Sequence, residues 1–133
     1  MPQISLRLPS LLCLAVPALA GLGISPLAAA DPAKGRATFR SACSSCHVVE
    51  SDSNVFGPHL NGVVGRPAAS LPDYNYSPAM REAGARGLVW DEVTLAAFLS
   101  SPSKTVPGTR MRFFGFWFSS QIEDVIAYLK ANP

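Results

Sequence analysis

Apolar residues recur at helical spacing in three segments of the chain. The clearest stripe lies in SSQIEDVIAYLKAN, where positions i, i+3, i+4 and i+7 are Ile122, Val125, Ile126 and Leu129. This spacing places the four side chains on one face of a helix. The pattern therefore predicts a helix that begins at Ser119 or Ser120 and packs this face against a core.

Two further segments combine apolar residues with helix-start signals. In DPAKGRATFRSAC, Asp31 is a candidate N-cap and Pro32 suits the first helical position. One face of this helix carries Gly35, Phe39 and Ala42. In DEVTLAAFLSSP, Asp91 is the candidate N-cap and Pro102 ends the helix. Its apolar residues are Val93, Leu95, Phe98 and Leu99. A shorter helix is predicted in SPAMREAG.

Long stretches rich in glycine and proline join these helices, and no pair of alternating strands is evident. We therefore expect an all-α fold, a single small domain of about three to five helices with long loops. Such loops leave a domain of this size without a self-sufficient core. The pattern thus indicates that a bound group fills the centre.

The first thirty residues have a different character. Arg7 precedes an interrupted apolar run from Leu11 to Ile24, and small residues follow up to Ala30. A basic start, a short apolar run and small residues at a cut point are typical of a secretory signal. The run is too short for a membrane span of about 20 residues. We expect residues 1–30, with Cys13, to be cleaved, leaving one domain over 31–133; an uncleaved anchor is the alternative.

Charge argues against one class of partner. The formal net charge is +2, and losing Arg7 with the signal leaves +1 for the mature chain. Nucleic-acid-binding domains carry a pronounced basic patch. We therefore expect no nucleic-acid partner. As a separate expectation, the mature chain acts as a monomer.

The candidate chemistry lies in SACSSCHVVE, which brings together Cys43, Cys46 and His47. A thioredoxin-like dithiol shares the C-x-x-C spacing but belongs at a strand-to-helix turn. A zinc site needs a fourth ligand, and the other histidine, His59, is expected at the surface of a loop and not as a ligand. A disulfide between the two thiols suits an exported protein but leaves His47 without a role.

The spacing C-x-x-C-H is also typical of covalent c-type haem attachment. Two thiols one turn apart form thioethers to the porphyrin, and His47 follows as a nitrogen ligand to the iron. Of the three methionines, Met1 leaves with the signal and Met80 lies in the YSPAM segment. Met111 is therefore the candidate sulfur ligand, with ordinary core filling as the alternative. A large apolar haem would also supply the missing centre.

At this point the mature chain resembles class I cytochrome c of the mitochondrial and alphaproteobacterial soluble type. The motifs that carry the resemblance run in order along the chain: GRATFRSACSSCH, FGPHLNGVVGR, YNYSPAM, the spaced Trp90, PGTRM and DVIAYL. The resemblance implies one covalent haem c, held by thioethers at Cys43 and Cys46. It implies His47 as the proximal ligand, with its second ring nitrogen bonded to the Pro58 carbonyl, and Met111 as the distal ligand.

The resemblance assigns further residues around the haem. It implies that Arg66, Tyr76 and Trp90 donate to the haem propionates, and that Phe98 and Thr109 line the haem near the sulfur. Two positions depart from the family pattern. Phe98 stands where many relatives have tyrosine, and Met80 stands where they commonly have a buried asparagine or a similar polar residue. Both changes remove a hydrogen-bonding group from the distal side.

The resemblance also places the terminal helices across one another, with Gly35 and Phe39 against Val125 and Tyr128. The implied function is that of a periplasmic one-electron carrier, which is not an enzyme because both axial positions of the iron are filled. Alternatives are a haem enzyme or sensor in which Met111 detaches, and a fixed module of a larger complex. The expected partners are redox proteins, either a membrane complex or a periplasmic oxidoreductase.

An aromatic run in RMRFFGFWFSS raises the question of how such partners dock. Five rings lie within six residues, at Phe113, Phe114, Phe116, Trp117 and Phe118. Five large rings so close together are not expected all to point inward. Relatives surround this region with lysines, which are sparse here. The sequence therefore predicts an apolar docking patch with Trp117 and Phe118 as its members.

Overall fold

The computed structural model describes residues 29–133. Of the expected signal segment, only the last two residues fall in this range; the rest of the segment, with Cys13, lies outside the described residues. Five helices follow one another: α1 (Pro32–Ala42), α2 (Pro78–Ala85), α3 (Glu92–Ser100), α4 (Pro102–Thr105) and α5 (Ser119–Lys130). Within this part of the chain, β pairing is limited to one isolated bridge between Pro67 and Val89. The expectation of a small all-α domain is confirmed.

The helices begin at the residues that the capping signals indicate. The Asp31 carboxylate accepts hydrogen bonds from two backbone N–H groups of α1, and the Asp91 carboxylate accepts one from the Thr94 N–H of α3. The Ser77 hydroxyl caps α2 in the same way. The sequence did not indicate α4. Pro102 ends α3 as expected but also opens α4, because proline suits the first position of a helix.

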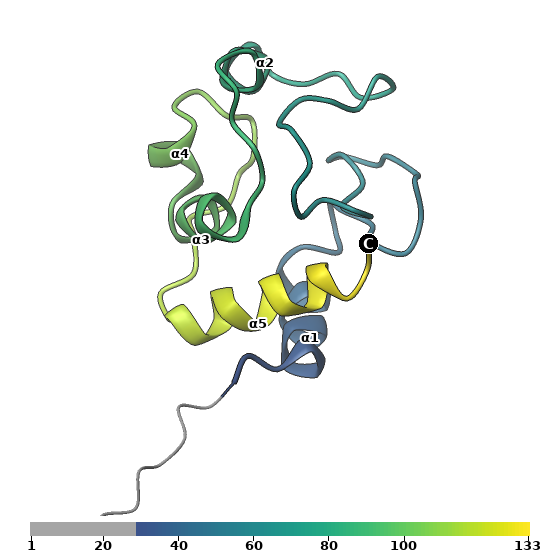
Figure 1. The fold of residues 1–133 in the computed structure, drawn as a ribbon, viewed down its shortest axis with the longest axis vertical. Helices are drawn as coiled ribbons and strands as arrows, with labels where there is room; N and C mark the ends of the chain where they lie inside the picture. The colour runs from purple at the N-terminus through teal and green to yellow at the C-terminus, as the bar shows by residue number, and fades with distance from the viewer. Residues whose placement is uncertain (1–28) are drawn as a thin grey trace, which may run out of the picture.

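Helices α1 and α5 cross at one end of the molecule, although they lie at opposite ends of the described chain (Figure 1). Gly35 makes this crossing close: a Cβ placed there would lie 1.9 Å from the Asp124 carbonyl oxygen. Beside it, the rings of Phe39 and Tyr128 pack with their centroids 5.5 Å apart. The predicted contact between the terminal helices is confirmed.

The buried face of each helix follows the apolar pattern with two exceptions. In α5 the buried residues are Ile122, Val125, Ile126, Tyr128 and Leu129. In α3, Leu95, Phe98 and Leu99 are buried, whereas Val93 is 79% exposed. Ala42, expected on the apolar face of α1, is exposed. Both exceptions lie at a helix end, since Val93 is the second residue of α3 and Ala42 is the last residue of α1.

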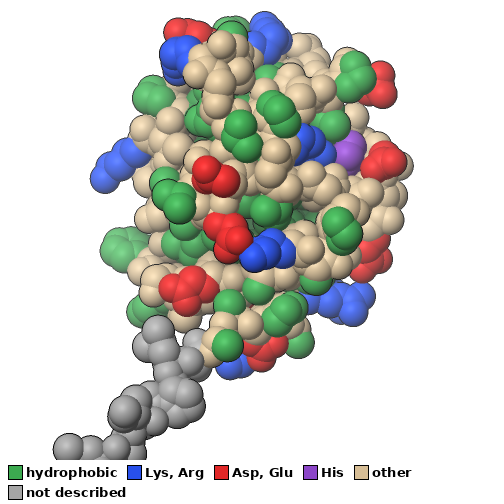
Figure 2. All heavy atoms as spheres, viewed as in Figure 1, with side chains coloured by type: hydrophobic (Ala, Val, Ile, Leu, Met, Phe, Trp, Pro, Cys, Tyr) green, Lys and Arg blue, Asp and Glu red, His purple; other side chains and the backbone are tan. Residues whose placement is uncertain are grey.

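Two long loops complete the domain. Residues 43–77 run along one side of the ribbon, and residues 106–118 return past α3 and α4 on the other side (Figure 1). Residues 74 and 75 connect the two sides, since the Tyr74 hydroxyl donates to the Phe56 carbonyl and the Arg110 guanidinium donates to the Asn75 carbonyl. On the face shown in Figure 2, acidic, basic and apolar side chains are interspersed. None of the described helices has both the length and the apolarity needed to cross a membrane.

Candidate haem-binding site

The turn after α1 presents Cys43, Cys46 and His47. Cys43 caps the helix through its backbone N–H, which bonds the Phe39 carbonyl at 2.8 Å. The Cys43 carbonyl then accepts from the N–H groups of Cys46 and His47, at 3.0 and 2.9 Å. These bonds close a tight turn, which holds both thiols and the imidazole on one short stretch of backbone.

The two thiols lie in different environments. Cys43 is buried and Cys46 is exposed, and neither forms a disulfide in the described part of the chain. Burial raises the pKa of the Cys43 thiol to about 11, and the neighbouring Cys46 shifts it in the same direction. Residues 29–133 contain no group of three or more His, Cys, Asp or Glu side chains that could hold a metal ion. The zinc alternative therefore lacks its ligands within this range.

His47 is fixed by a single hydrogen bond. Its Nδ1 lies 2.8 Å from the Pro58 carbonyl oxygen. A carbonyl only accepts, so Nδ1 carries the proton and Nε2 keeps its lone pair. Burial lowers the pKa of His47, against the opposing effect of the Pro58 bond, so the neutral ring is favoured. A neutral imidazole with a free Nε2 is the form that ligates iron, and its Nδ1 bond orients the ring.

Gly57 provides the space for this ring. A Cβ placed at Gly57 would lie 2.3 Å from Cε1, 2.6 Å from Nδ1 and 2.8 Å from Nε2 of His47. Its own N–H bonds the Cys46 carbonyl at 2.7 Å, so the backbone lies directly against the C-x-x-C-H turn. The cradle at Gly57 and Pro58 therefore fits an iron-binding imidazole. The sequence indicated Pro58 through the family resemblance but gave no reason to single out Gly57.

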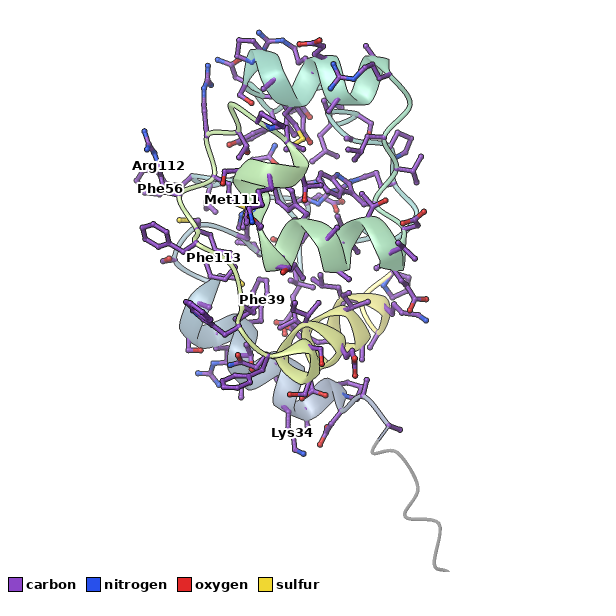
Figure 3. All side chains as sticks on the ribbon, turned by 90° about the vertical axis from the view of Figure 1, so that its left-hand side faces the viewer. Lys34, Phe39, Phe56, Met111, Arg112 and Phe113 are labelled. Carbon is purple, nitrogen blue, oxygen red and sulfur yellow. The ribbon has the colours of Figure 1, made fainter. Side chains whose placement is uncertain are left out.

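Met111 lies on the returning loop and is partly buried against the core. Thr109 orders this loop in two ways: its N–H bonds the Val106 carbonyl, and its hydroxyl accepts from the Met111 N–H at 3.3 Å. Figure 3 shows Met111 lying inward of Arg112 and Phe56, which stand at the edge of the molecule. The loop thus holds Met111 inward while the next residue turns to solvent.

Arg66, Tyr76 and Trp90 come from three segments and gather in one region. The Trp90 N–H bonds the Arg66 carbonyl at 2.9 Å. Burial lowers the pKa of the Arg66 guanidinium, and the nearby Tyr76 phenol is the strongest opposing influence. Burial likewise raises the pKa of Tyr76. The indole N–H of Trp90 takes part in none of the side-chain hydrogen bonds of the described residues, so this donor is available. Its ring packs on Phe98 with centroids 4.9 Å apart.

His59 is placed differently from the expectation. It was expected at the surface, but it is only 8% exposed. Its backbone N–H bonds the Asn54 side chain and its carbonyl accepts from Arg66, which pulls the residue inward. The buried Nδ1 has no hydrogen-bond partner and lies 3.8 Å from an oxygen of the exposed Asp52. No local sequence signal indicates these contacts.

The aromatic run divides between the interior and the surface. The rings of Phe113 and Phe116 are partly buried and pack together with centroids 4.9 Å apart. Trp117 and Phe118 are 93% and 68% exposed, as predicted, and Phe114 is also fully exposed. The exposure of Phe56 was not foreseen, because it lies far from this run in the sequence.

Comparison with known proteins agrees with this geometry. The family model described as cytochrome c matches residues 32–133. Cytochrome c2 of Agrobacterium tumefaciens (strain II Chrys) is 48% identical over 74% of this chain and 89% of its own length. Cytochrome c2 of Afifella marina is 44% identical over 74% of this chain and 79% of its own length. The solved structure of cytochrome cH from Methylobacterium extorquens superposes with a TM-score of 0.69 at 40% identity, covering 76% of this chain and 98% of that one.

The matched region contains both the C-x-x-C-H turn and the Met111 loop, and nearly all of the described residues. Members of the matched family bind one haem c covalently and carry electrons, and they are not enzymes. In this chain a neutral histidine follows two free thiols, and the fold and sequence match those of the family over this region. The chain therefore belongs to the cytochrome c family.

Proposed function

We propose that this chain is a periplasmic electron carrier that holds one haem c between His47 and Met111. The observation that carries the proposal is the His47 ring, which is neutral, bonded through Nδ1 to Pro58 and open at Nε2. Cys43 and Cys46 supply the two thioethers. When bound, the haem provides the Fe(III)/Fe(II) couple that accepts and releases one electron.

The chain's own residues set the properties of that couple. The Pro58 carbonyl holds the Nδ1 proton and thereby increases the donor strength of His47. Met111 provides a soft sulfur, which favours the reduced state and raises the potential. With His47 and Met111 both bound to the iron, no coordination position would be left for a substrate.

Arg66, Tyr76 and Trp90 are proposed to bind the haem propionates. A buried carboxylate is costly unless it is paired or hydrogen-bonded. The three residues offer a guanidinium, a phenol and an indole N–H from a common region. Phe98, buried against Trp90, and Met80, partly buried in α2, leave the distal side apolar. Thr109 orders the loop that carries Met111.

Residues 1–30 are proposed to direct export and then to be removed, so that residues 31–133 act as a monomer in the periplasm. Its partners are redox proteins, namely a membrane complex or a periplasmic oxidoreductase. Trp117 and Phe118 are proposed to form a docking patch, and their exposure supports this role.

The proposal is tested by offering the reduced holoprotein separately to solubilised membranes and to periplasmic extract of the source cells. One fraction should oxidise it, at a rate that depends weakly on ionic strength and falls in Trp117→Lys. Absence of electron exchange with both fractions would refute the carrier role. A rate that collapses as salt rises, with Trp117→Lys unaffected, would refute the aromatic patch.

A further inference from the structure

His59 is buried beside Asp52 and lacks a hydrogen bond at one ring nitrogen. Its side chain is 11% exposed, and its Nδ1 is the one buried side-chain nitrogen or oxygen without a partner among the described residues. Nδ1 lies 3.8 Å from Oδ1 of Asp52, which is beyond hydrogen-bonding distance. Buried polar groups are normally paired, so an unpaired one calls for an explanation. The proposed haem ligation gives this imidazole no role.

The carboxylate opposite this ring is held in place. Oδ1 of Asp52 accepts from the Asn61 side-chain amide at 3.0 Å, and the same oxygen faces His59. A lone pair on Nδ1 would repel this oxygen, so we assign the ring proton to Nδ1 and the lone pair to Nε2. Nε2 is not among the buried unpaired atoms of residues 29–133 and makes no hydrogen bond with them, so it reaches solvent. The ring can therefore take up a proton from water at Nε2 and become a cation that faces Asp52.

The same loop holds the guanidinium of Arg66. Its Nη2 donates to the His59 carbonyl at 2.8 Å, and its Nη1 donates to the Asn61 carbonyl at 3.0 Å. Burial lowers the pKa of Arg66, and Tyr76 and Asp52 both oppose this shift. Arg66 is also one of the proposed donors to the haem propionates. A charge on His59 would therefore lie next to a group that is proposed to bind the haem.

Further ionisable side chains on the neighbouring elements form pairs of their own. These pairs are Glu50 with Arg36 of α1, and Lys130 of α5 with Glu92 of α3. The carboxyl carbon of Pro133 lies beside Gly62, three residues beyond His59 on this loop. Asp52 and Arg66 are thus the charged side chains that act on His59 in the described part of the chain.

We infer that His59 is a proton-binding residue, favoured in its charged form by Asp52, that couples the redox state of the holoprotein to pH through Arg66. The inference rests on the proposed carrier function and adds a proton to it. Histidine is the side chain whose charge ordinarily changes between about pH 5 and 8. A cation at His59 stabilises the reduced state, because that state has one positive charge fewer.

The coupling makes proton uptake accompany electron uptake. When the protein gains an electron, Nε2 of His59 takes up part of a proton from water on average, and it returns that proton when the electron leaves. By linkage, the reduction potential falls as pH rises through the ionisation of His59. The charge acts through Arg66 and is partly screened by solvent at Nε2. We expect reduction to raise the proton affinity of His59 about threefold, which corresponds to a fall of about 30 mV across the ionisation.

Two measurements on the holoprotein test this coupling between pH 5 and 8. Spectroelectrochemical titration gives the reduction potential at each pH, and NMR of the oxidised and reduced protein follows the imidazole directly. The sequence contains two histidines, and His47 is proposed to bind the iron, so one imidazole signal should titrate. Its midpoint should lie about 0.5 pH unit higher in the reduced protein, which is the same threefold change.

His59→Gln removes the ionisable ring and keeps the backbone contacts of the residue. The Asn54 side chain accepts from the backbone N–H of residue 59, and Arg66 donates to its carbonyl, so neither bond needs the imidazole. A merely structural role for His59 would leave the pH dependence of the potential unchanged in this variant. We expect the potential of His59→Gln to be independent of pH over this range.

Asp52→Asn tests the facing carboxylate without changing the histidine. The Asp52 side chain is 81% exposed, so solvent weakens its effect. We expect about a twofold loss of proton affinity at His59, and the titration midpoint should fall by about 0.3 pH unit. The control is Glu82→Gln on α2, which removes the same charge from a carboxylate that pairs with Arg86. It should keep the wild-type midpoint. If Asp52→Asn also keeps it, the carboxylate does not favour the charged ring and the inference fails.

Other outcomes separate this inference from the carrier function. A reversible couple whose potential is constant from pH 5 to 8, or an imidazole signal that does not titrate, overturns the inference and leaves the carrier role intact. A potential that still falls with pH in His59→Gln assigns the proton to another group, such as a haem propionate, and also overturns it. If His59→Gln does not fold, the wild-type NMR titration and Asp52→Asn still decide. Absence of a reversible one-electron couple in the wild type overturns both proposals.

Discussion

Replacing Gly57 with alanine should displace His47, the proposed iron ligand, without changing the His47 side chain itself. The added Cβ would lie 2.3–2.8 Å from three atoms of the His47 ring. Ordinary contact begins near 3.4 Å, so the ring or the loop must move by roughly 1 Å. Gly57 has no left-handed backbone conformation, so alanine itself fits the backbone. The perturbation is therefore steric and directed at the ligand.

The expected cost follows from two contributions. Overpacking a buried site costs about 1–3 kcal/mol. Weakening the 2.8 Å bond from His47 Nδ1 to the Pro58 carbonyl adds about 1 kcal/mol. Together these lower the melting temperature of the holoprotein by roughly 10–20 °C. A less strongly bonded imidazole is a weaker donor to Fe(III), so the reduction potential should rise. A difference of about 0.5–1 kcal/mol between oxidation states corresponds to roughly 20–40 mV.

Spectroelectrochemical titration and thermal unfolding of the holoprotein measure both effects. The control is Gly87→Ala, where φ is +86° and a Cβ would meet nothing within 4 Å. That variant should lose about 1–2 kcal/mol from left-handed backbone strain and leave the potential unchanged. If Gly57→Ala shows the same potential as the wild type, Gly57 does not control the position of His47 and the reasoning is wrong.

Three further predictions concern other parts of the fold. Gly35→Ala should lower the free energy of unfolding in guanidinium by about 3 kcal/mol without changing the potential, because a Cβ there meets the Asp124 carbonyl oxygen at 1.9 Å; a smaller loss than in Gly87→Ala would contradict the close crossing. Asp91→Ala should destabilise the protein at pH 7, since bonds from α3 hold the pKa of the Asp91 carboxyl below its usual value. That stabilisation is present above the pKa of the unfolded state and is lost as pH falls through the pKa of the folded state. The free energies of unfolding of the wild type and of Asp91→Ala should therefore converge in acid; a difference that stays constant with pH would exclude this origin. Phe98→Tyr should alter the potential and the alkaline loss of the sulfur ligand, and no change in either would place Phe98 away from the sulfur.

The sequence predicted the parts of the fold that depend on local patterns. The periodicity of α5 and the caps at Asp31 and Asp91 determine where the long helices begin. Helix α4 was missed because its four residues are too few to show a period. Pro102 has two roles, and only its role in ending α3 is evident from the sequence.

The site was predictable where residue spacing or family motifs specify it. The C-x-x-C-H spacing indicated Cys43 and His47, and the resemblance indicated Pro58, whose bond to His47 the structure contains. The contact between Gly57 and the imidazole depends on how a loop folds back, and spacing carries no such information. The burial of His59 likewise depends on how the loop folds, because the His59 N–H bonds the Asn54 side chain and the His59 carbonyl accepts from Arg66.

The most direct test of the central claim is the near-infrared absorption of the oxidised holoprotein, measured for the wild type and for Met111→Ala. A weak band from sulfur–iron ligation should be present in the wild type and absent in the variant. The covalently attached haem should remain in both, since Cys43 and Cys46 are untouched. A band that persists in Met111→Ala, or that is missing from the wild type, would contradict the assignment of Met111 as the second axial ligand.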